Sequence, residues 1–208
     1  MGRMAPVHKY NTMRIDDILA IRGLEANDLS LIQSQCEQFF EEAGNTPLYK
    51  NLPSTYDDLH KVKVRQRKAK DTLDHQTFNA AFESQHHKLR ERAIFAHGIS
   101  SLVEATEYDE PFFVLPIDGF QYVYSPEIKN SDNNYKQVIE MFYENFGQAE
   151  GTKLAVDMIR FSYLHEKLQS GIKNGSEIIV YNIPYYYAAR ADAFESYDDF
   201  LHLVQSIW

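Results

Sequence analysis

Apolar residues recur at three- and four-residue spacing in several stretches of the chain, which is the period of an amphipathic helix. Within residues 26–44, for example, Leu29, Ile32 and Cys36 fall on one helical face. This pattern predicts helices over residues 13–24, 26–44, 77–92, 133–147, 151–172 and 196–208.

Shorter apolar runs, rich in β-branched and aromatic residues, predict strands in the middle and near the end of the chain. Residues 110–126 hold two such runs around Asp118 and Gly119, a dipeptide that predicts a β-hairpin. Residues 93–100 predict a short strand, and residues 177–189 predict two more. Because helices and strands come in clusters rather than in strict alternation, we predict an α+β fold.

The length of the chain favours a single main domain. With 208 residues, 44% hydrophobic and 25% charged, the chain is long enough to bury a sizeable core and has an ordinary globular composition. We expect one domain over residues 36–208, with residues 1–35 as an N-terminal helical extension that packs against it.

The charge balance disfavours nucleic acid as a partner. The formal net charge is −9, and an acidic surface repels phosphate backbones. Residues 61–70 are the local exception, with six cations in ten residues. Such a run is usually a solvated face, and its alternative role is to bind a small molecule that carries phosphate. A third interpretation is that this run binds nucleic acid. The overall acidity of the chain makes it the least favoured of the three.

Cysteine and histidine usage argues against a disulfide and against a metal. Cys36 is the single cysteine, and the eight histidines show no ligand spacing such as HExxH. No apolar run approaches the roughly 18 residues of a membrane span, and the N-terminus lacks a signal-peptide core. We therefore expect that the protein binds no metal, is not associated with a membrane and is located in a cytosol.

The standard catalytic motifs are absent: the sequence has no GxGxxG, no P-loop and no GxSxG. Four stretches taken together nevertheless resemble one family. They are PLYKN (47–51), VRQRKAKDT (64–72), RERAIFAHGIS (90–100) and GSEIIVYNIPYYYAA (175–189). In this order they resemble the ADP-ribosyltransferase fold in its bacteriophage form, over roughly residues 36–189. The resemblance implies a split, two-sheet β core with flanking helices, which holds NAD in a cleft between the sheets.

The resemblance also implies roles for particular residues. Members of the family have a late strand that opens with the catalytic glutamate, and Glu177 takes that position here. An early arginine of the family is Lys50 here, and a hydroxyl residue of the middle strand is His97. The upstream acid that many transferases carry is Gly175 in this chain. The implied NAD-binding residues are Lys50, Arg65, Arg67, Arg90, Phe95, His97 and Tyr186.

Each of these residues also has a purely structural interpretation. Glu177 would then flank a buried strand, Lys50 would be a solvated lysine, and His97 a buried histidine with its hydrogen bonds satisfied. Tyr186 would pack in the core or at its edge. A lysine in place of arginine keeps the charge but loses the planar, bidentate geometry, which Arg65 or Arg67 would then have to supply.

The chemistry explains why one carboxylate matters. When the bond between nicotinamide and ribose breaks, positive charge develops on the ribose, as in glycoside cleavage. A carboxylate held nearby in a site that excludes water stabilises that charge. The resemblance thus implies an NAD-dependent mono-ADP-ribosyltransferase-like phage protein that modifies a host protein, with NAD as its substrate.

The alternative is a catalytically inactive member of the same fold, a virion structural protein or a protein that interacts with the host. An enzyme predicts that Glu177, Lys50, Phe95 and His97 converge on one pocket with Arg65 or Arg67 at its rim. A scaffold predicts that the protein's own side chains fill this cleft. The partners would be a host acceptor protein or other virion proteins, in the host cytoplasm or in the virion.

Overall fold

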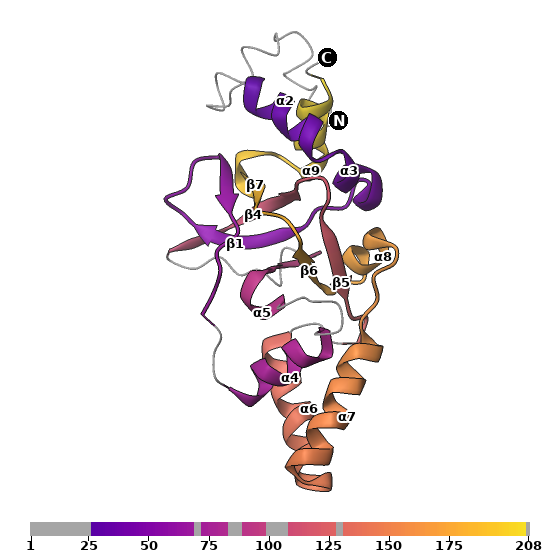
Figure 1. Ribbon diagram of the computed structural model, residues 1–208. Helices are drawn as coiled ribbons and strands as arrows, with labels where there is room; N and C mark the ends of the chain where they lie inside the picture. Colours follow the sequence, from indigo (N-terminus) through magenta and orange to yellow (C-terminus); the bar gives the residue numbers. More distant parts are fainter. Residues whose placement is uncertain (1–25, 69–71, 83–88, 99–107, 128–130, 207–208) are drawn as a thin grey trace, which may run out of the picture.

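The computed structural model describes residues 26–68, 72–82, 89–98, 108–127 and 131–206 (Figure 1). The helix predicted over residues 13–24 lies outside the described residues, as does Trp208. The fold is α+β, as predicted. The predicted boundary between an extension and the main domain, after residue 35, stays a prediction.

The helices fall where the apolar pattern places them, but three of the predicted ones are divided. The helices are α2 (Ala26–Gln35), α3 (Glu37–Ala43), α4 (Leu73–Phe82), α5 (Leu89–Arg92), α6 (Ser131–Phe146), α7 (Gln148–Ser162), α8 (Leu168–Lys173) and α9 (Tyr197–Gln205), with a 3₁₀ turn, η3 (Ala191–Ala193). The predicted helix over 26–44 breaks at Cys36, and the predicted helix over 77–92 becomes α4 and α5. The predicted helix over 151–172 is divided because Leu164 forms a β-bridge with Tyr124 instead of a helical turn.

All the described strands belong to one antiparallel sheet. They are β1 (Tyr49–Pro53), β2 (Leu59–Lys63), β3 (Ile94–His97), β4 (Asp109–Pro116), β5 (Gln121–Tyr124), β6 (Glu177–Tyr181) and β7 (Tyr185–Arg190). Their order in this seven-stranded sheet is β2-β7-β4-β1-β3-β6-β5.

The sheet has a narrow join in its middle. Strands β1 and β3 are neighbours through a single residue pair, Tyr49 with His97, whereas β1 and β4 share five pairs. We call β2-β7-β4-β1 the first half-sheet and β3-β6-β5 the second half-sheet. The two separate sheets that the resemblance implies are therefore replaced by one hydrogen-bonded sheet whose halves meet at one point.

The predicted hairpin around Asp118 is wrong. Strand β4 pairs with β1 and β7, and β5 pairs with β6 at the far edge of the sheet. The turn is held by α3 instead: the Gln38 backbone N–H donates to the Asp118 carboxylate at 2.9 Å, and the Gly119 N–H donates to the Gln38 side chain at 2.9 Å. At this turn the chain crosses from the first half-sheet to the second.

Residues 182–184 make the return crossing, between β6 and β7. Asn182 has a left-handed backbone with φ of 67°, and its side-chain amide donates to the Gly119 carbonyl at 3.3 Å. This hydrogen bond links the segment between β6 and β7 to the segment between β4 and β5.

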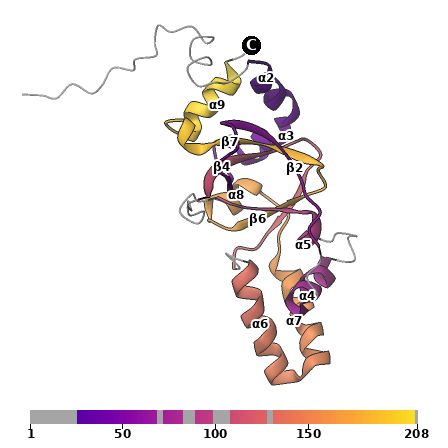
Figure 2. The same cartoon turned by 90° about the vertical axis from the view of Figure 1, so that its left-hand side faces the viewer.

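Two hydrophobic clusters form the core, and they contain alternate residues of β6. The first contains Leu29 and Ile32 of α2, Phe200 of α9 and much of the first half-sheet. The second contains Phe78 of α4, Ile159 of α7 and the outward side of β6. Figures 1 and 2 show α2 and α9 at one end of the molecule and α6 and α7 projecting at the other. Among the described helices, none is both long enough and apolar enough to cross a membrane.

Candidate functional site

The narrow join of the half-sheets brings together residues from distant parts of the sequence. His97 ends β3, Glu177 opens β6, and the two are direct cross-strand partners. The His97 Nε2 lies 3.9 Å from the Glu177 Oε1, and the two side chains are 16% and 8% exposed. Tyr49 pairs with His97 from the other half-sheet, so the adjacent Lys50 lies at the same place.

Lys50 reaches across the join. Its Nζ donates a hydrogen bond to the Phe95 carbonyl of β3 at 3.1 Å. Burial first, and then the charge of Arg67, lower the pKa of Lys50 from 10.5 to about 8, while Glu177 and Asp109 act in the opposite direction. The ammonium group therefore lies within electrostatic range of both the carboxylate and a guanidinium.

His97 is a neutral base in this setting. Burial, and then the charge of Lys50, lower the pKa of its imidazole below the ordinary value. Within the described part of the chain its Nδ1 is buried and has no hydrogen-bond partner. Buried polar atoms normally find a partner, so this nitrogen is a group that a bound ligand can satisfy.

Two arginines surround the Phe95 ring. The guanidinium of Arg90 lies 5.2 Å from the Phe95 centroid and 4.6 Å from that of Phe78, and Arg90 is only 6% exposed. The guanidinium of Arg67 lies 5.6 Å from the Phe95 centroid. The backbone N–H of Arg67 donates to the Glu91 carbonyl at 2.9 Å, which anchors the segment after β2 against α5. These contacts hold two guanidinium groups against the ring of Phe95, the residue whose carbonyl accepts from Lys50, and the charge of Arg67 acts on Lys50 directly.

Tyr186 and Arg65 lie at the margin of this group. The Tyr186 ring is 3% exposed and packs in the first core cluster, so it is not available for stacking on a ligand. Burial raises the pKa of its hydroxyl, and the charges of Arg67 and Arg65 act against that rise. Arg65 itself is exposed.

The other two tyrosines of the run serve the opposite face of the sheet. The hydroxyls of Tyr185 and Tyr187 donate to the Gln35 side chain at 3.1 and 2.9 Å, and Lys61 lies over the Tyr185 ring at 3.7 Å. Lys61 of the basic run therefore packs on the strand surface, whereas Arg67, among the described residues of the run, contacts Phe95 at the site.

Gly175, where the family has a further acid, has a structural role that the sequence analysis missed. Its N–H donates to the Ile172 carbonyl at 2.9 Å, and the Ser176 N–H donates to the Gly171 carbonyl at 3.1 Å. With φ of 67° at Gly175, these two bonds form a Schellman motif that ends α8. An acidic side chain at this position would be strained, so Glu177 has no acidic companion two residues before it. A glycine directly after a helical pattern is the signal that could have identified this motif.

The structure thus brings together Glu177, His97, Lys50, Phe95, Arg67 and Arg90. The concave pocket predicted for them stays a prediction. Two surface cavities are lined by described residues, one between α3 and α9 and one beside β5, and none of these six residues lines either. No group of three His, Cys, Asp or Glu among the described residues is placed to hold a metal ion.

Comparison of the chain with models of protein families, with curated proteins and with solved structures gave no match. The functional argument therefore depends on the site itself.

Proposed function

We propose that the protein is an NAD-dependent mono-ADP-ribosyltransferase-like enzyme of bacteriophage type that modifies a host protein, in the host cytoplasm or after delivery with the virion. One observation carries this proposal. A buried carboxylate, a neutral histidine and a lysine meet where the half-sheets join, and two arginines lie beside them.

The cations suit the diphosphate of NAD. Lys50, Arg67 and Arg90 come from three different elements and gather around Phe95. Charge-assisted hydrogen bonds to phosphate oxygens are among the strongest in proteins, and arginine makes them in pairs. Arg67 and Arg90 supply the bidentate geometry that Lys50 lacks. The partnerless Nδ1 of His97 suits a ribose hydroxyl, the role that a serine or threonine has in the family.

Glu177 suits the ribose. In the proposed reaction the bond between nicotinamide and ribose breaks, and its electron pair leaves with nicotinamide. A nucleophile of the acceptor protein then bonds to the same carbon and loses its proton. The Glu177 side chain is only 8% exposed, so its carboxylate lies in a site of low dielectric constant. In such a site a carboxylate strongly stabilises positive charge on the ribose.

A second candidate function is favoured by one specific observation. Lys50 already donates to the Phe95 carbonyl, and Glu177 already faces His97, so the groups of the site partly satisfy one another. Such mutual pairing is what a catalytically inactive virion or host-interaction protein of the same fold would retain.

The two candidates are separated by titrating purified protein with NAD in a calorimeter while free nicotinamide is measured in the same samples. The proposal predicts saturable binding together with release of nicotinamide. Binding without release supports the inactive protein, and the absence of both overturns the assignment of an NAD site.

A matched pair of variants locates the binding. Lys50→Met removes a cation of the site, whereas Lys63→Met removes an exposed cation of β2. We expect Lys50→Met to weaken NAD binding about tenfold or more, the usual effect of losing one charge-assisted hydrogen bond. We expect Lys63→Met to bind like the wild type. Equal weakening in both variants would place the ligand elsewhere.

A further inference from the structure

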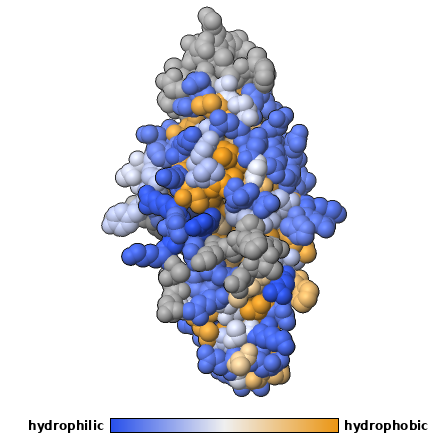
Figure 3. Space-filling view, viewed as in Figure 1, coloured by the Kyte–Doolittle hydropathy of each residue, from blue (hydrophilic) through white to orange (hydrophobic). Residues whose placement is uncertain are grey.

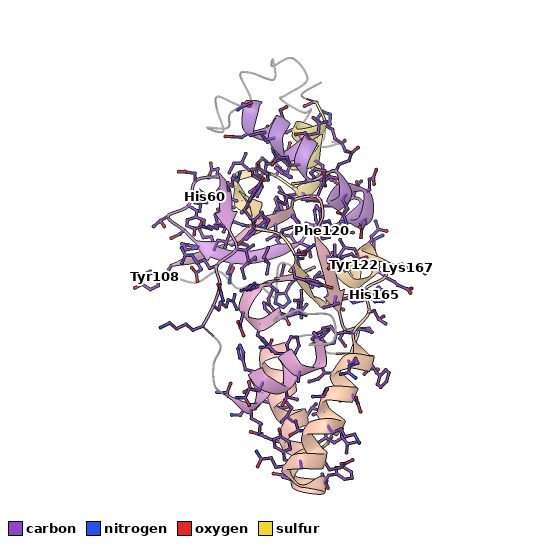
Figure 4. The ribbon with its side chains drawn as sticks, in the orientation of Figure 1. His60, Tyr108, Phe120, Tyr122, His165 and Lys167 are labelled. Carbon is purple, nitrogen blue, oxygen red and sulfur yellow. The ribbon has the colours of Figure 1, made fainter. Side chains whose placement is uncertain are left out.

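One of the two surface cavities lies beside the edge strand β5, away from the join of the half-sheets. Its volume is about 440 Å³, within the range of small-molecule sites. The residues that line it are Glu42, Phe120, Gln121, Tyr122, Val123, His165 and Tyr181. They come from α3, the crossing segment, β5, the loop after α7 and β6. Figure 4 labels three of them, Phe120, Tyr122 and His165.

The chemistry of this lining is that of a cation site. Among the lining residues Glu42 is the one carboxylate, and there is no lysine or arginine. The rings of Phe120 and Tyr122 lie side by side, with centroids 6.0 Å apart and planes inclined by 34°. Aromatic faces attract cations, and a partly desolvated carboxylate does so more strongly.

The Glu42 carboxylate is held in place by its neighbours. Its Oε1 accepts a hydrogen bond from the Gln38 side chain at 2.8 Å, and it also bonds the Tyr122 hydroxyl. Tyr122 in turn accepts a hydrogen bond from the Leu168 N–H at 3.1 Å, so its own proton is directed to Glu42. Burial first, and then Glu42, raise the pKa of Tyr122 to about 12, which keeps that proton in place. A carboxylate accepts about four hydrogen bonds, so acceptor capacity remains for a ligand.

We propose that this cavity binds an organic cation, an ammonium, amidinium or guanidinium group on an apolar body, with Glu42 as the counter-ion and the half-buried ring of Tyr122 as the apolar wall, supported from behind by the buried ring of Phe120. The same chemistry is offered by a free amine and by an arginine side chain of a bound peptide. The site is separate from the proposed NAD site. Glu177 and Tyr181 are at opposite ends of β6, roughly 13 Å apart at the usual rise of a strand.

The test compares benzamidine with benzamide, a neutral molecule of the same shape, by ligand-observed NMR titration of the full chain. We expect saturable binding of benzamidine and binding of benzamide that is at least about tenfold weaker, because benzamide lacks the charge. Equal binding of the two, or no binding of benzamidine in the millimolar range, overturns the proposal.

Variants assign the effect to the cavity. Glu42→Gln keeps the shape and the hydrogen bond to Gln38, and we expect it to weaken benzamidine about tenfold. Glu41→Gln makes the same change of charge on the exposed neighbouring residue, so it is the matched control and binds like the wild type. Tyr122→Phe releases the Glu42 carboxylate and weakens binding less than Glu42→Gln. Equal effects of Glu42→Gln and Glu41→Gln would show that general charge, and not this cavity, attracts the ligand.

A second probe distinguishes the two sources of the cation. N-acetylarginine amide presents the guanidinium as a peptide does. If it binds more tightly than benzamidine, the cavity recognises a side chain of a partner protein. If benzamidine binds more tightly, the ligand is a free amine. NAD titration of Glu42→Gln remains unchanged in either case, which keeps this site distinct from the site at the join.

Discussion

At the scale of single residues, Lys50 decides how the proposed site responds to pH. A buried lysine loses its proton more readily than an exposed one, because burial disfavours the charged form. Its pKa of about 8 lies close to physiological pH, whereas that of an arginine would not. A lysine at this position therefore makes the charge of the proposed site adjustable by pH.

The first prediction is a loss of NAD affinity as the pH rises through about 8. If the protonated Lys50 is the form that binds, its population falls about tenfold between pH 7 and pH 9, and the affinity falls with it. Calorimetric titration at several pH values measures the effect. Lys50→Arg, which stays charged, removes the fall. A fall of the same size in Lys50→Arg would assign it to another group.

The same ionisation affects stability without ligand. Between pH 8 and 10.5 the unfolded chain keeps a proton on Lys50 that the folded protein has released. Because the unfolded state binds more protons in this window, the Lys50 contribution to the free energy of unfolding rises with pH. Denaturant unfolding at several pH values measures this for the wild type and Lys50→Met. Between pH 8 and 10.5 the free energy of unfolding of the wild type should rise relative to that of the variant.

Arg190 is the residue whose loss we expect to destabilise the fold most among the cations outside the site. Its guanidinium contacts Asp58 at 3.0 Å and the Ser54 carbonyl at 2.9 Å, and it also pairs with Glu110 and with the Tyr56 carbonyl. These contacts hold the loop between β1 and β2 against β4 and β7.

We predict that Arg190→Met lowers the free energy of unfolding by about 3 kcal/mol, because it leaves buried acceptors and a partly buried carboxylate without their cation. Lys136→Met is the control. Its exposed pair with Glu140 at 3.9 Å should contribute less than about 1 kcal/mol. Chemical denaturation measures both, and similar losses in the two variants would contradict the structural role of Arg190.

At the scale of elements, the contact between β3 and α8 fixes the position of His97. Gly98 follows β3, and a Cβ atom there would lie 2.0 Å from the Ile172 carbonyl oxygen. Only a residue without a side chain permits this approach. The end of β3 and the start of β6 are thereby both positioned by α8, which precedes Glu177 in the sequence.

We predict that Gly98→Ala lowers the free energy of unfolding by about 1–3 kcal/mol and also weakens NAD binding, because the backbone next to His97 must move. Gly119→Ala is the matched comparison. Nothing lies within 4 Å of a Cβ there, and its φ of 84° makes the change strained but local. Thermal unfolding and NAD titration of both variants test this, and unchanged NAD binding in Gly98→Ala would contradict the account.

The sequence predicted the elements better than their connections. Helical and strand periods are local, so the helices and strands predicted within the described residues lie close to where they were expected. The hairpin at Asp118 failed because a turn-forming dipeptide carries no information on which strand lies beside which. Here Gln38, about 80 residues before the turn, forms hydrogen bonds with the turn, and the chain continues into the other half-sheet.

The site was predictable in part for the same reason. Glu177 and His97 were named as candidates from the resemblance, but their cross-strand pairing depends on the register of β3 with β6, which local pattern does not set. Tyr186 was named for stacking and is instead a buried core ring, because alternation along β7 turns it to the side opposite Tyr185 and Tyr187.

At the scale of the whole molecule, the protein is acidic, but several positive charges gather at the proposed site. The chain carries a net charge of −9, and much of the face drawn in Figure 3 is hydrophilic. The guanidinium groups of Arg67 and Arg90 gather at one ring, that of Phe95; Arg90 is buried there and Arg67 is exposed. This arrangement favours a small anionic ligand over a polymer of phosphates.

We therefore predict that the protein does not bind an oligonucleotide at physiological salt. Fluorescence anisotropy with labelled single-stranded and double-stranded DNA measures this. Micromolar or tighter binding that weakens steeply with salt would contradict the prediction and would assign the basic run to nucleic acid.

The central claim is that Glu177, at the join of the half-sheets, promotes cleavage of NAD. It is tested most directly by the rate of nicotinamide release from NAD, measured for the wild type and for Glu177→Gln, with thermal unfolding as the check that both are folded. The account predicts measurable release by the wild type and a loss of about 100- to 1000-fold in the variant, with NAD still bound. Equal release by the two folded proteins would contradict it.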